Sequence, residues 1–158
     1  MQDLAKQAFD ALKNHKAILA TAESCTGGMI AAAITDFSGS SEIFDRGFVT
    51  YSNQAKMDLL AVKTETLEMH GAVSEQTAQE MAEGALQNSL ATIAISVTGI
   101  AGPTGGSPEK PVGLVYMGLA LKDQETKIFK LNFDGDRHAV RVQTRGEAFK
   151  QIVESLKS

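Results

Sequence analysis

The sequence predicts an α/β domain, a three-layer α/β/α sandwich around a mixed sheet of about five strands. Helix-like and strand-like segments alternate through the first half of the chain, which is typical of parallel strands joined by crossover helices. Two strand-like runs, at 112–121 and 127–133, are separated by a short polar linker and predict an antiparallel hairpin. The length of 158 residues suits one domain, which we expect to span 1–158.

The elements of the first half are read from apolar periodicity, β-branched runs and capping residues. Leu4 to Leu12 has apolar residues at helical spacing, and the Ser- and Gly-rich stretch over 35–41 is typical of a loop. In order, we expect a helix over 4–12, a strand over 17–21, a helix over 29–34, a loop over 35–41, a strand over 47–51, and a helix capped by Asn53 that runs to Leu60.

The second half follows the same rules. In order, we expect a helix capped by Ser74 that runs to Asn88, a strand over 91–97, a glycine-rich loop over 99–113, the hairpin, and a helix capped by Asp134 that runs to Leu156. Ligand crevices of such sheets lie at the carboxyl ends of strands. We expect the loops at 22–28, 37–42 and 98–106 to form that crevice.

Composition excludes several classes of function. The net charge is −4 and the 15 basic residues are scattered, so nucleic acid is not an expected partner. No apolar stretch is long enough to span a membrane. The amino end shows no basic segment followed by an apolar core, so we expect no signal peptide. A single cysteine, Cys25, excludes an internal disulfide. We therefore expect a cytoplasmic protein.

Metal ligands are not clustered in the sequence. His15, His70 and His138 lie far apart and form no recognisable metal-binding spacing. We expect no metal site and no cofactor.

The segment Thr21–Gly28 joins a predicted strand to a predicted helix. Its paired glycines, Gly27 and Gly28, let backbone amides approach a ligand, and a helix amino end favours an anion. A tight turn without a ligand is an equally good reading. Cys25 could be a nucleophile there, but a small buried cysteine is the favoured interpretation.

A second group combines Ser38–Ser41 with Tyr51 and Lys56. A serine is a weak nucleophile until a base takes its proton, and a lysine can be that base if its pKa is lowered. On the residues alone, a solvated loop and a surface lysine are the simpler readings. Ser41 can meet Tyr51 and Lys56 only if the loop over 38–46 folds back along the following strand.

Two further features point to ligand binding. The segment over 98–113 holds five glycines and all three prolines of the chain, and its amides could form an anion nest or an oxyanion hole. Arg137 and Arg141 stand four residues apart, on one helix face that could grip a phosphate. Ordinary surface ion pairs are the alternative for these arginines.

Taken in order, these segments resemble the CinA C-terminal family, also called the nicotinamide-nucleotide amidase family. The residues that carry the resemblance are Thr21–Gly28 (TAESCTGG), Ser38–Ser41 (SGSS), Tyr51–Lys56 (YSNQAK), Gly71–Ser74 (GAVS), Val97–Pro103 (VTGIAGP), Pro108–Gly113 (PEKPVG), and Gly135–Arg137 with Arg141. Each motif alone is weak, but the ordered set is specific and covers almost the whole chain.

The resemblance implies a stand-alone amidohydrolase that converts nicotinamide mononucleotide to nicotinic acid mononucleotide and ammonia, in pyridine nucleotide salvage. It implies Ser41 as the nucleophile, with Tyr51 and Lys56 handling its proton. The substrate-binding residues that we expect are Ser24, Thr26, Gly27, Gly28, Thr98, Gly99, Gly102 and Arg141.

We also expect a homo-oligomer, a dimer or a larger assembly. The expected binding partner is the nucleotide substrate. Two alternatives stay open: a non-catalytic nucleotide-binding or interaction module, in which Lys56 is exposed and protonated, and an amidohydrolase that uses Cys25.

Overall fold

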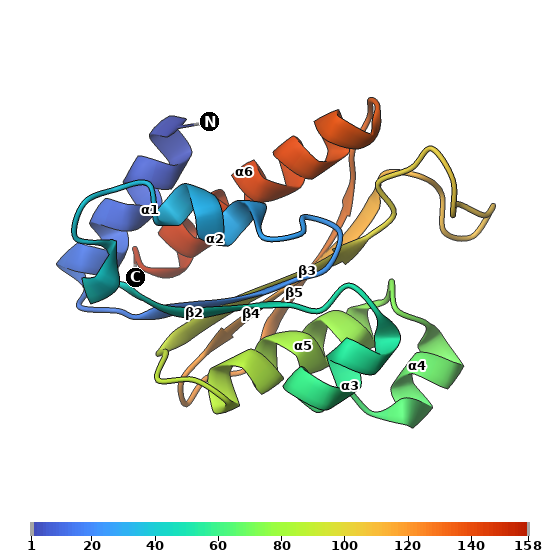
Figure 1. Cartoon of the computed structure of the whole chain (residues 1–158), viewed down its shortest axis with the longest axis horizontal. Coiled ribbons are helices and arrows are strands. Elements are labelled where there is room, and N and C mark those ends of the chain that lie inside the picture. The colour runs from blue at the N-terminus through green and yellow to red at the C-terminus, as the bar shows by residue number, and fades with distance from the viewer. Residues whose placement is uncertain (1, 158) are drawn as a thin grey trace.

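The computed structural model describes residues 2–157 as three layers, with a five-stranded sheet between two layers of helices (Figure 1). The sheet order is β2-β1-β3-β4-β5. β1 pairs in parallel with β2 and β3, whereas β4 is antiparallel to β3 and β5. The strands are β1 (Leu19–Glu23), β2 (Phe44–Val49), β3 (Ile93–Gly99), β4 (Leu114–Leu121) and β5 (Lys127–Asn132). The predicted mixed α/β/α sandwich is confirmed.

Helices cover both faces of the sheet (Figure 1). One face carries α1 (Gln2–Asn14), α2 (Met29–Ile34) and α6 (Arg137–Ser155). The other carries α3 (Asn53–Leu60), α4 (Thr64–His70) and α5 (Glu75–Gln87). A 3-10 turn, η1 (Ser40–Glu42), precedes β2. All three parallel strands therefore end on the same edge of the sheet, at the right of Figure 1.

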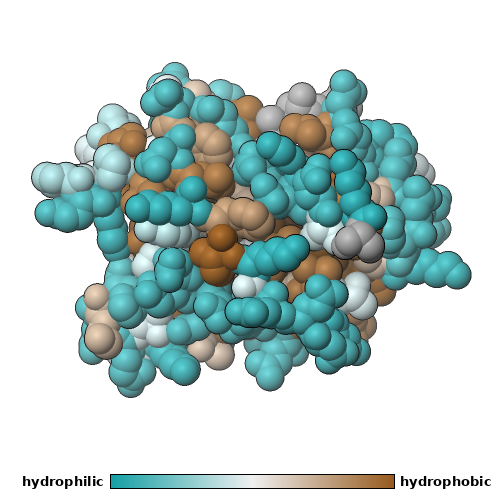
Figure 2. Space-filling model, turned by 180° about the vertical axis from the view of Figure 1, so that it is seen from behind, coloured by the Kyte–Doolittle hydropathy of each residue, from teal (hydrophilic) through white to brown (hydrophobic). Residues whose placement is uncertain are grey.

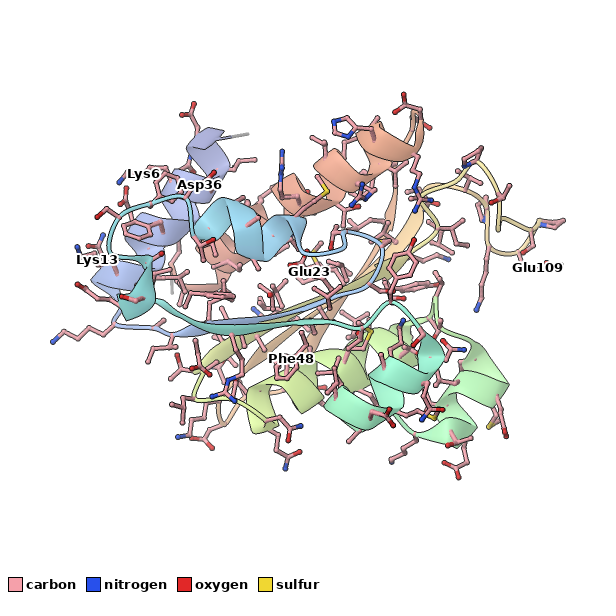
Figure 3. The ribbon with its side chains drawn as sticks, in the orientation of Figure 1. Lys6, Lys13, Glu23, Asp36, Phe48 and Glu109 are labelled. Atoms are coloured by element: carbon pink, nitrogen blue, oxygen red, sulfur yellow. The ribbon has the colours of Figure 1, made fainter. Side chains whose placement is uncertain are left out.

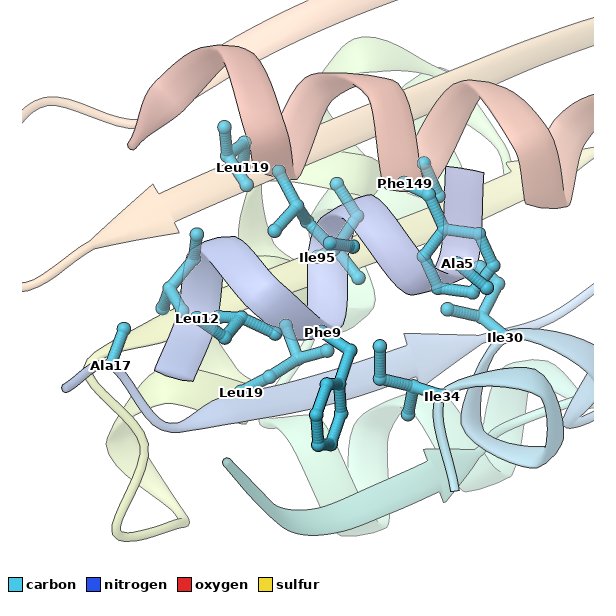
Figure 4. Packing of buried hydrophobic residues seen from close by; sticks show 14 of the residues in the cluster. Ala5, Phe9, Leu12, Ala17, Leu19, Ile30, Ile34, Ile95, Leu119 and Phe149 are labelled. Carbon is cyan, nitrogen blue, oxygen red and sulfur yellow. The ribbon is translucent and has the colours of Figure 1, made fainter. Parts of the chain in front are cut away.

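The main hydrophobic core lies between the sheet and the layer of α1, α2 and α6 (Figure 4). Phe9 and Leu12 of α1 meet Leu19 of β1 and Phe149 of α6, and all four are almost fully buried. A smaller core on the opposite face joins α5 to β1 and β3. Because β1 is buried on both faces, residues at its carboxyl end are held rigidly.

The surface outside these cores is largely polar. On the face seen in Figure 2, hydrophilic side chains surround a small central hydrophobic patch. No helix within residues 2–157 combines the length and apolar character that a membrane crossing requires.

Several element boundaries differ from the prediction. β2 begins at Phe44 and ends at Val49, earlier than the predicted 47–51, and α4 was not predicted. The helix caps are also shifted. The Ser52 side chain accepts a hydrogen bond from the Ala55 amide, so Ser52 caps α3 and Asn53 does not. Asp136 caps α6 by accepting from the Ala139 amide, and Asp134 does not. In both cases the side chain that lies three residues before a free amide is the one that caps.

Gly84 allows α5 to approach α3 closely. An ideal Cβ at Gly84 would collide with the backbone carbonyl of Leu60, the last residue of α3. Neighbouring side chains of α5 are buried in the smaller core, so the helix has little room to shift.

We predict that Gly84→Ala destabilises the protein by about 1–3 kcal/mol, although alanine is the better helix former. The collision with α3 outweighs the gain in helix propensity. Urea denaturation measures the effect, with Gln87→Ala, an exposed position in the same helix, as the matched control. Unchanged or increased stability of Gly84→Ala would contradict the packing argument.

Candidate active site

A pocket of about 250 Å³ lies at the carboxyl ends of the three parallel strands. The turn after β1, the segment from the end of β2 into α3, the segment between α4 and α5, the loop after β3 and the first residue of α6 form its walls. Its lining residues are Ser24, Cys25, Tyr51, Asn53, Lys56, Ala72, Val73, Thr98, Gly99, Ile100, Ala101, Gly102, Thr104, Gly105 and Arg137. A larger cavity of about 600 Å³ lies at the opposite end of the sheet, between α5 and the β4–β5 turn. Of these two, the smaller one holds a serine hydroxyl beside a buried lysine.

Lys56 is the chemically unusual residue of this pocket. It belongs to α3 and is only 1% exposed, which is rare for a lysine. Its Nζ donates to Ser24 Oγ at 3.0 Å and to the Thr50 carbonyl at 2.8 Å. Burial lowers the pKa of Lys56, because a charged ammonium loses its hydration there. The uncharged amine, which can act as a base, is therefore favoured relative to an ordinary lysine.

Ser24 is presented by the turn between β1 and α2. Its amide donates to the Val97 carbonyl of β3 at 3.1 Å, which anchors the residue to the sheet. Gly27 and Gly28 follow with positive φ of 59° and 105°, so that the chain can turn sharply into α2. The Ser24 hydroxyl is thus fixed against Lys56 and borders the pocket.

Cys25 is placed beside Ser24 but is poorly suited to attack a substrate. Burial raises the pKa of its thiol to about 11, because the thiolate would lose its hydration. The thiol is therefore neutral at physiological pH. This agrees with the small buried cysteine favoured from the sequence.

Ser41 does not meet Tyr51 and Lys56 in the structure. It is an exposed residue of η1, before β2, whereas Tyr51 and Lys56 follow β2. From Phe44 to Val49 the strand covers about 16 Å at its usual rise. The loop over 37–42 therefore lies at the amino end of the sheet, on the left of Figure 1, and not at the crevice where it was predicted. It does not fold back along the strand.

Tyr51 and Arg137 meet across the mouth of the pocket. Arg137 Nη2 donates to the Tyr51 hydroxyl at 2.8 Å, and Nη1 donates to the Gly102 carbonyl at 2.9 Å. Tyr51 is 61% exposed, so the guanidinium is accessible to an entering ligand. Of the two arginines considered from the sequence, Arg137 lines the pocket.

Arg141 instead binds the backbone of the turn that follows β1. Its Nε donates to the Cys25 carbonyl at 3.0 Å and its Nη2 to the Thr26 carbonyl at 3.1 Å. Thr26 is fully buried and donates to the Glu23 carboxylate. Together with Gly27 and Gly28, these predicted substrate residues shape the turn, and none of them lines the pocket.

The loop after β3 forms part of the pocket wall. The predicted residues Thr98, Gly99 and Gly102 line it, and the Thr98 hydroxyl donates to the Ala72 carbonyl at 2.8 Å. The base of the loop is closed, because Ile100 N donates to the Leu114 carbonyl and Gly113 N to the Ile100 carbonyl. At the tip, Glu109 points away from the sheet (Figure 3).

Sequence reasoning missed Asn53, Ala72 and Val73 as lining residues. The order of elements could have indicated Asn53, because it follows the end of a parallel strand.

Within residues 2–157, no group of three or more His, Cys, Asp or Glu side chains is arranged to hold a metal ion.

Residues 1–156 match the family model described as the CinA C-terminal domain. The nicotinamide-nucleotide amidohydrolase PncC of Enterobacter agglomerans is 56% identical over 143 residues, which cover 90% of this chain and 87% of that protein. The PncC of Shigella flexneri is 50% identical over 152 residues, with 96% and 92% covered.

Longer proteins also match. A competence-damage inducible protein of Caldicellulosiruptor bescii is 56% identical over 133 residues, and the match covers 84% of this chain but 32% of that protein. The chain thus spans about a third of that relative's length. Among solved structures, the competence/damage inducible protein CihA from Agrobacterium tumefaciens has a TM-score of 0.95 and 46% identity, with 99% and 95% of the two chains covered.

We predict that burial of Lys56 makes stability depend on pH. Its folded pKa lies below the unfolded value, so the unfolded state binds more protons between those two values. The free energy of unfolding should therefore rise with pH in that window, relative to Lys56→Met, and level off above about pH 10.5. Urea denaturation of both proteins across this range measures the slope. The control is Lys130→Met at an exposed position of β5, and parallel curves for wild type and Lys56→Met would contradict the prediction.

Proposed function

The chain belongs to the CinA C-terminal domain family, and we propose that it is a nicotinamide-nucleotide amidohydrolase in which Ser24 is the nucleophile and Lys56 its base. It hydrolyses nicotinamide mononucleotide to nicotinic acid mononucleotide and ammonia. Relatives at 56% and 50% identity, matched over most of their length, are named for this activity. The cytoplasmic location and homo-oligomeric assembly expected from the sequence form part of the same proposal.

One observation carries the assignment of the nucleophile: a buried lysine amine lies 3.0 Å from a serine hydroxyl at the wall of a pocket. Ser24 replaces Ser41 in this proposal because Ser41 lies beyond the other end of β2. The burial of Lys56 also weakens the alternative of a non-catalytic module, for which we expected an exposed, protonated lysine.

The reaction needs one proton acceptor and no cofactor. An uncharged amine at Lys56 has two hydrogens and a lone pair. Lys56 Nζ donates to Ser24 Oγ in the structure; in the neutral amine, one hydrogen can stay on the Thr50 carbonyl while the lone pair turns to accept the Ser24 proton. Ser24 Oγ attacks the carboxamide carbon while its proton passes to Lys56 Nζ. Lys56 then returns the proton to the amide nitrogen, the C–N bond breaks, and ammonia leaves.

Hydrolysis of the acyl-enzyme repeats the proton transfers. A water molecule attacks the ester carbon, and Lys56 accepts its proton. Lys56 then protonates Ser24 Oγ as the C–O bond breaks and the acid is released. Residues of the Cys25 turn and of the loop over 98–105 border the same space, and we assign the stabilisation of the oxyanion in both tetrahedral intermediates to backbone amides among them.

Arg137 is the residue that we assign to the substrate phosphate. Its guanidinium lies at the pocket mouth and its hydrogen bond to Tyr51 is exposed, so a phosphate can replace that partner at small cost. Tyr51 then lines the entrance beside the nucleotide. The remaining bond from Arg137 to the Gly102 carbonyl keeps the guanidinium oriented.

We predict that Ser24→Ala lowers ammonia release from nicotinamide mononucleotide by at least about 1000-fold, whereas Ser41→Ala stays within about twofold of wild type. Only the first substitution removes the attacking oxygen. Ammonia is measured under saturating substrate, and unfolding curves confirm that both variants fold. Full activity of Ser24→Ala, or loss of activity in Ser41→Ala, would refute this choice of nucleophile.

We predict that Arg137→Ala raises KM for the mononucleotide by about 10- to 100-fold, because a charge-assisted contact with the phosphate is lost. Hydrolysis of nicotinamide riboside, which lacks the phosphate, should be much less affected. Lys130→Ala, on an exposed site of β5, is the matched control for loss of positive charge. An equal loss on both substrates would show that Arg137 acts on the protein and not on the phosphate.

A further inference from the structure

The Ser24 turn lies between two charged groups that the proposed mechanism does not use. Glu23, the last residue of β1, is fully buried beneath the amino end of α2 (Figure 3). Arg141 reaches the turn from α6. Three donors meet the Glu23 carboxylate, and both of its oxygens are engaged: Oε1 accepts from the Thr26 hydroxyl at 2.6 Å and from Ile30 N at 3.0 Å, and Oε2 accepts from Ala31 N at 3.0 Å.

A buried carboxylate with three such donors is geometrically constrained. Two of the donors are first-turn amides of α2, so the carboxylate caps this short helix. The third, the Thr26 hydroxyl, belongs to the turn itself. The Glu23 side chain therefore fixes where the turn ends, while the Glu23 backbone fixes where it begins.

The backbone of Glu23 also joins the nucleophile to the base. Its carbonyl accepts the amide of Thr50 at 2.9 Å, and the carbonyl of Thr50 accepts from Lys56 Nζ. A shift at Glu23 thus moves Ser24 directly and changes its register with Lys56 through Thr50.

Arg141 holds the opposite side of the turn. Its guanidinium binds two successive carbonyls, those of Cys25 and Thr26. Gly27 leaves room for this contact, because a Cβ there would lie 3.3 Å from Arg141 Nη2. The turn is thus held by an anion that binds its amides and hydroxyl and by a cation that binds its carbonyls.

We propose that Glu23 is a positioning residue for the reaction: its carboxylate, with Arg141 opposite, holds the turn so that the Ser24 hydroxyl stays within reach of Lys56. This inference rests on the proposed function of Ser24. It assigns to Arg141 a role on the protein backbone in place of the phosphate contact expected from the sequence.

The experiment compares Glu23→Gln with a matched variant, Glu80→Gln. The Glu80 carboxylate accepts from Lys63 N at 2.9 Å and from the Thr66 hydroxyl at 2.7 Å, so it supports the start of α4 much as Glu23 supports α2. It lies outside the pocket. Glutamine keeps one acceptor oxygen at each site but presents an NH2 group to the other donor.

For Glu23→Gln we expect kcat to fall about 10- to 100-fold with KM within about twofold, because a displaced nucleophile impairs the reaction more than binding. Glu80→Gln should keep wild-type kcat. Arg141→Lys, which can serve only one of the two carbonyls well, should lower kcat in the same way, and it tests the proposal if Glu23→Gln does not fold. Unchanged kcat in folded Glu23→Gln, or an equal loss in Glu80→Gln, would overturn the proposal.

A second measurement does not depend on catalysis. Cys25 is the only cysteine of the chain, is buried within the turn, and has a raised pKa. If Glu23 holds the turn, Glu23→Gln should react with dithionitrobenzoate at least about tenfold faster than wild type, through local opening. Glu80→Gln should not. We call the hold of Glu23 and Arg141 on the turn the clamp. Wild-type thiol reactivity in Glu23→Gln would show that this clamp does not exist.

The two measurements separate the clamp from the proposed function. Ser24→Ala is assayed in parallel, and its retained activity would refute the nucleophile even if thiol reactivity supports the clamp. Loss of activity in Ser24→Ala, with unchanged kcat and thiol reactivity in Glu23→Gln, would refute only the positioning role.

Discussion

The pocket depends on a single hydrogen bond, the one between the Lys56 amine and the Ser24 hydroxyl. A lysine that is 1% exposed is costly to bury as a cation, so its surroundings must either pair the charge or favour the neutral amine. Here its two polar partners are an uncharged hydroxyl and a backbone carbonyl. The environment therefore favours the neutral amine. Because burial is unfavourable for the charged ammonium, it leaves Lys56 in a form that can accept a proton.

The sheet supplies the precision that this bond requires. Ser24 and Thr50 follow neighbouring parallel strands whose ends are level, since Glu23 pairs with Val49. β1 is buried on both faces between two hydrophobic cores, so its end cannot shift without disturbing both layers. Chemistry at the carboxyl ends of parallel strands thus draws its rigidity from the packing of the whole domain.

The parts of this structure that could be predicted from sequence are those with local causes. Ser74 caps α5 as predicted, because its side chain and the Thr77 amide that it binds are three residues apart. The hairpin of β4 and β5 likewise follows from its short linker. The short helix α4 was missed because it lacks a side-chain N-cap and an extended apolar pattern.

The choice of serine could not be made locally. Ser41 is closer in sequence to Lys56 than Ser24 is, yet sequence distance does not decide which hydroxyl meets the amine. The direction of β2 decides it, since the chain passes Ser41 before that strand and reaches Lys56 after it. Parallel pairing of β1 with β2 brings Ser24 to the same edge instead. Lys56, which the resemblance implies as a proton-handling residue, lines the pocket, and tertiary pairing determines that Ser24 is the serine beside it.

The closed base of the loop after β3 has an evolutionary consequence. Its two backbone hydrogen bonds link residue 100 to residues 113 and 114, so the tip can change in length or composition without moving β3 or β4. The tip contributes Thr104 and Gly105 to the pocket, whereas Ser24 and Lys56 come from the turn after β1 and from α3. Mutations in the tip can therefore change which ligands fit the pocket while Ser24 and Lys56 keep their positions.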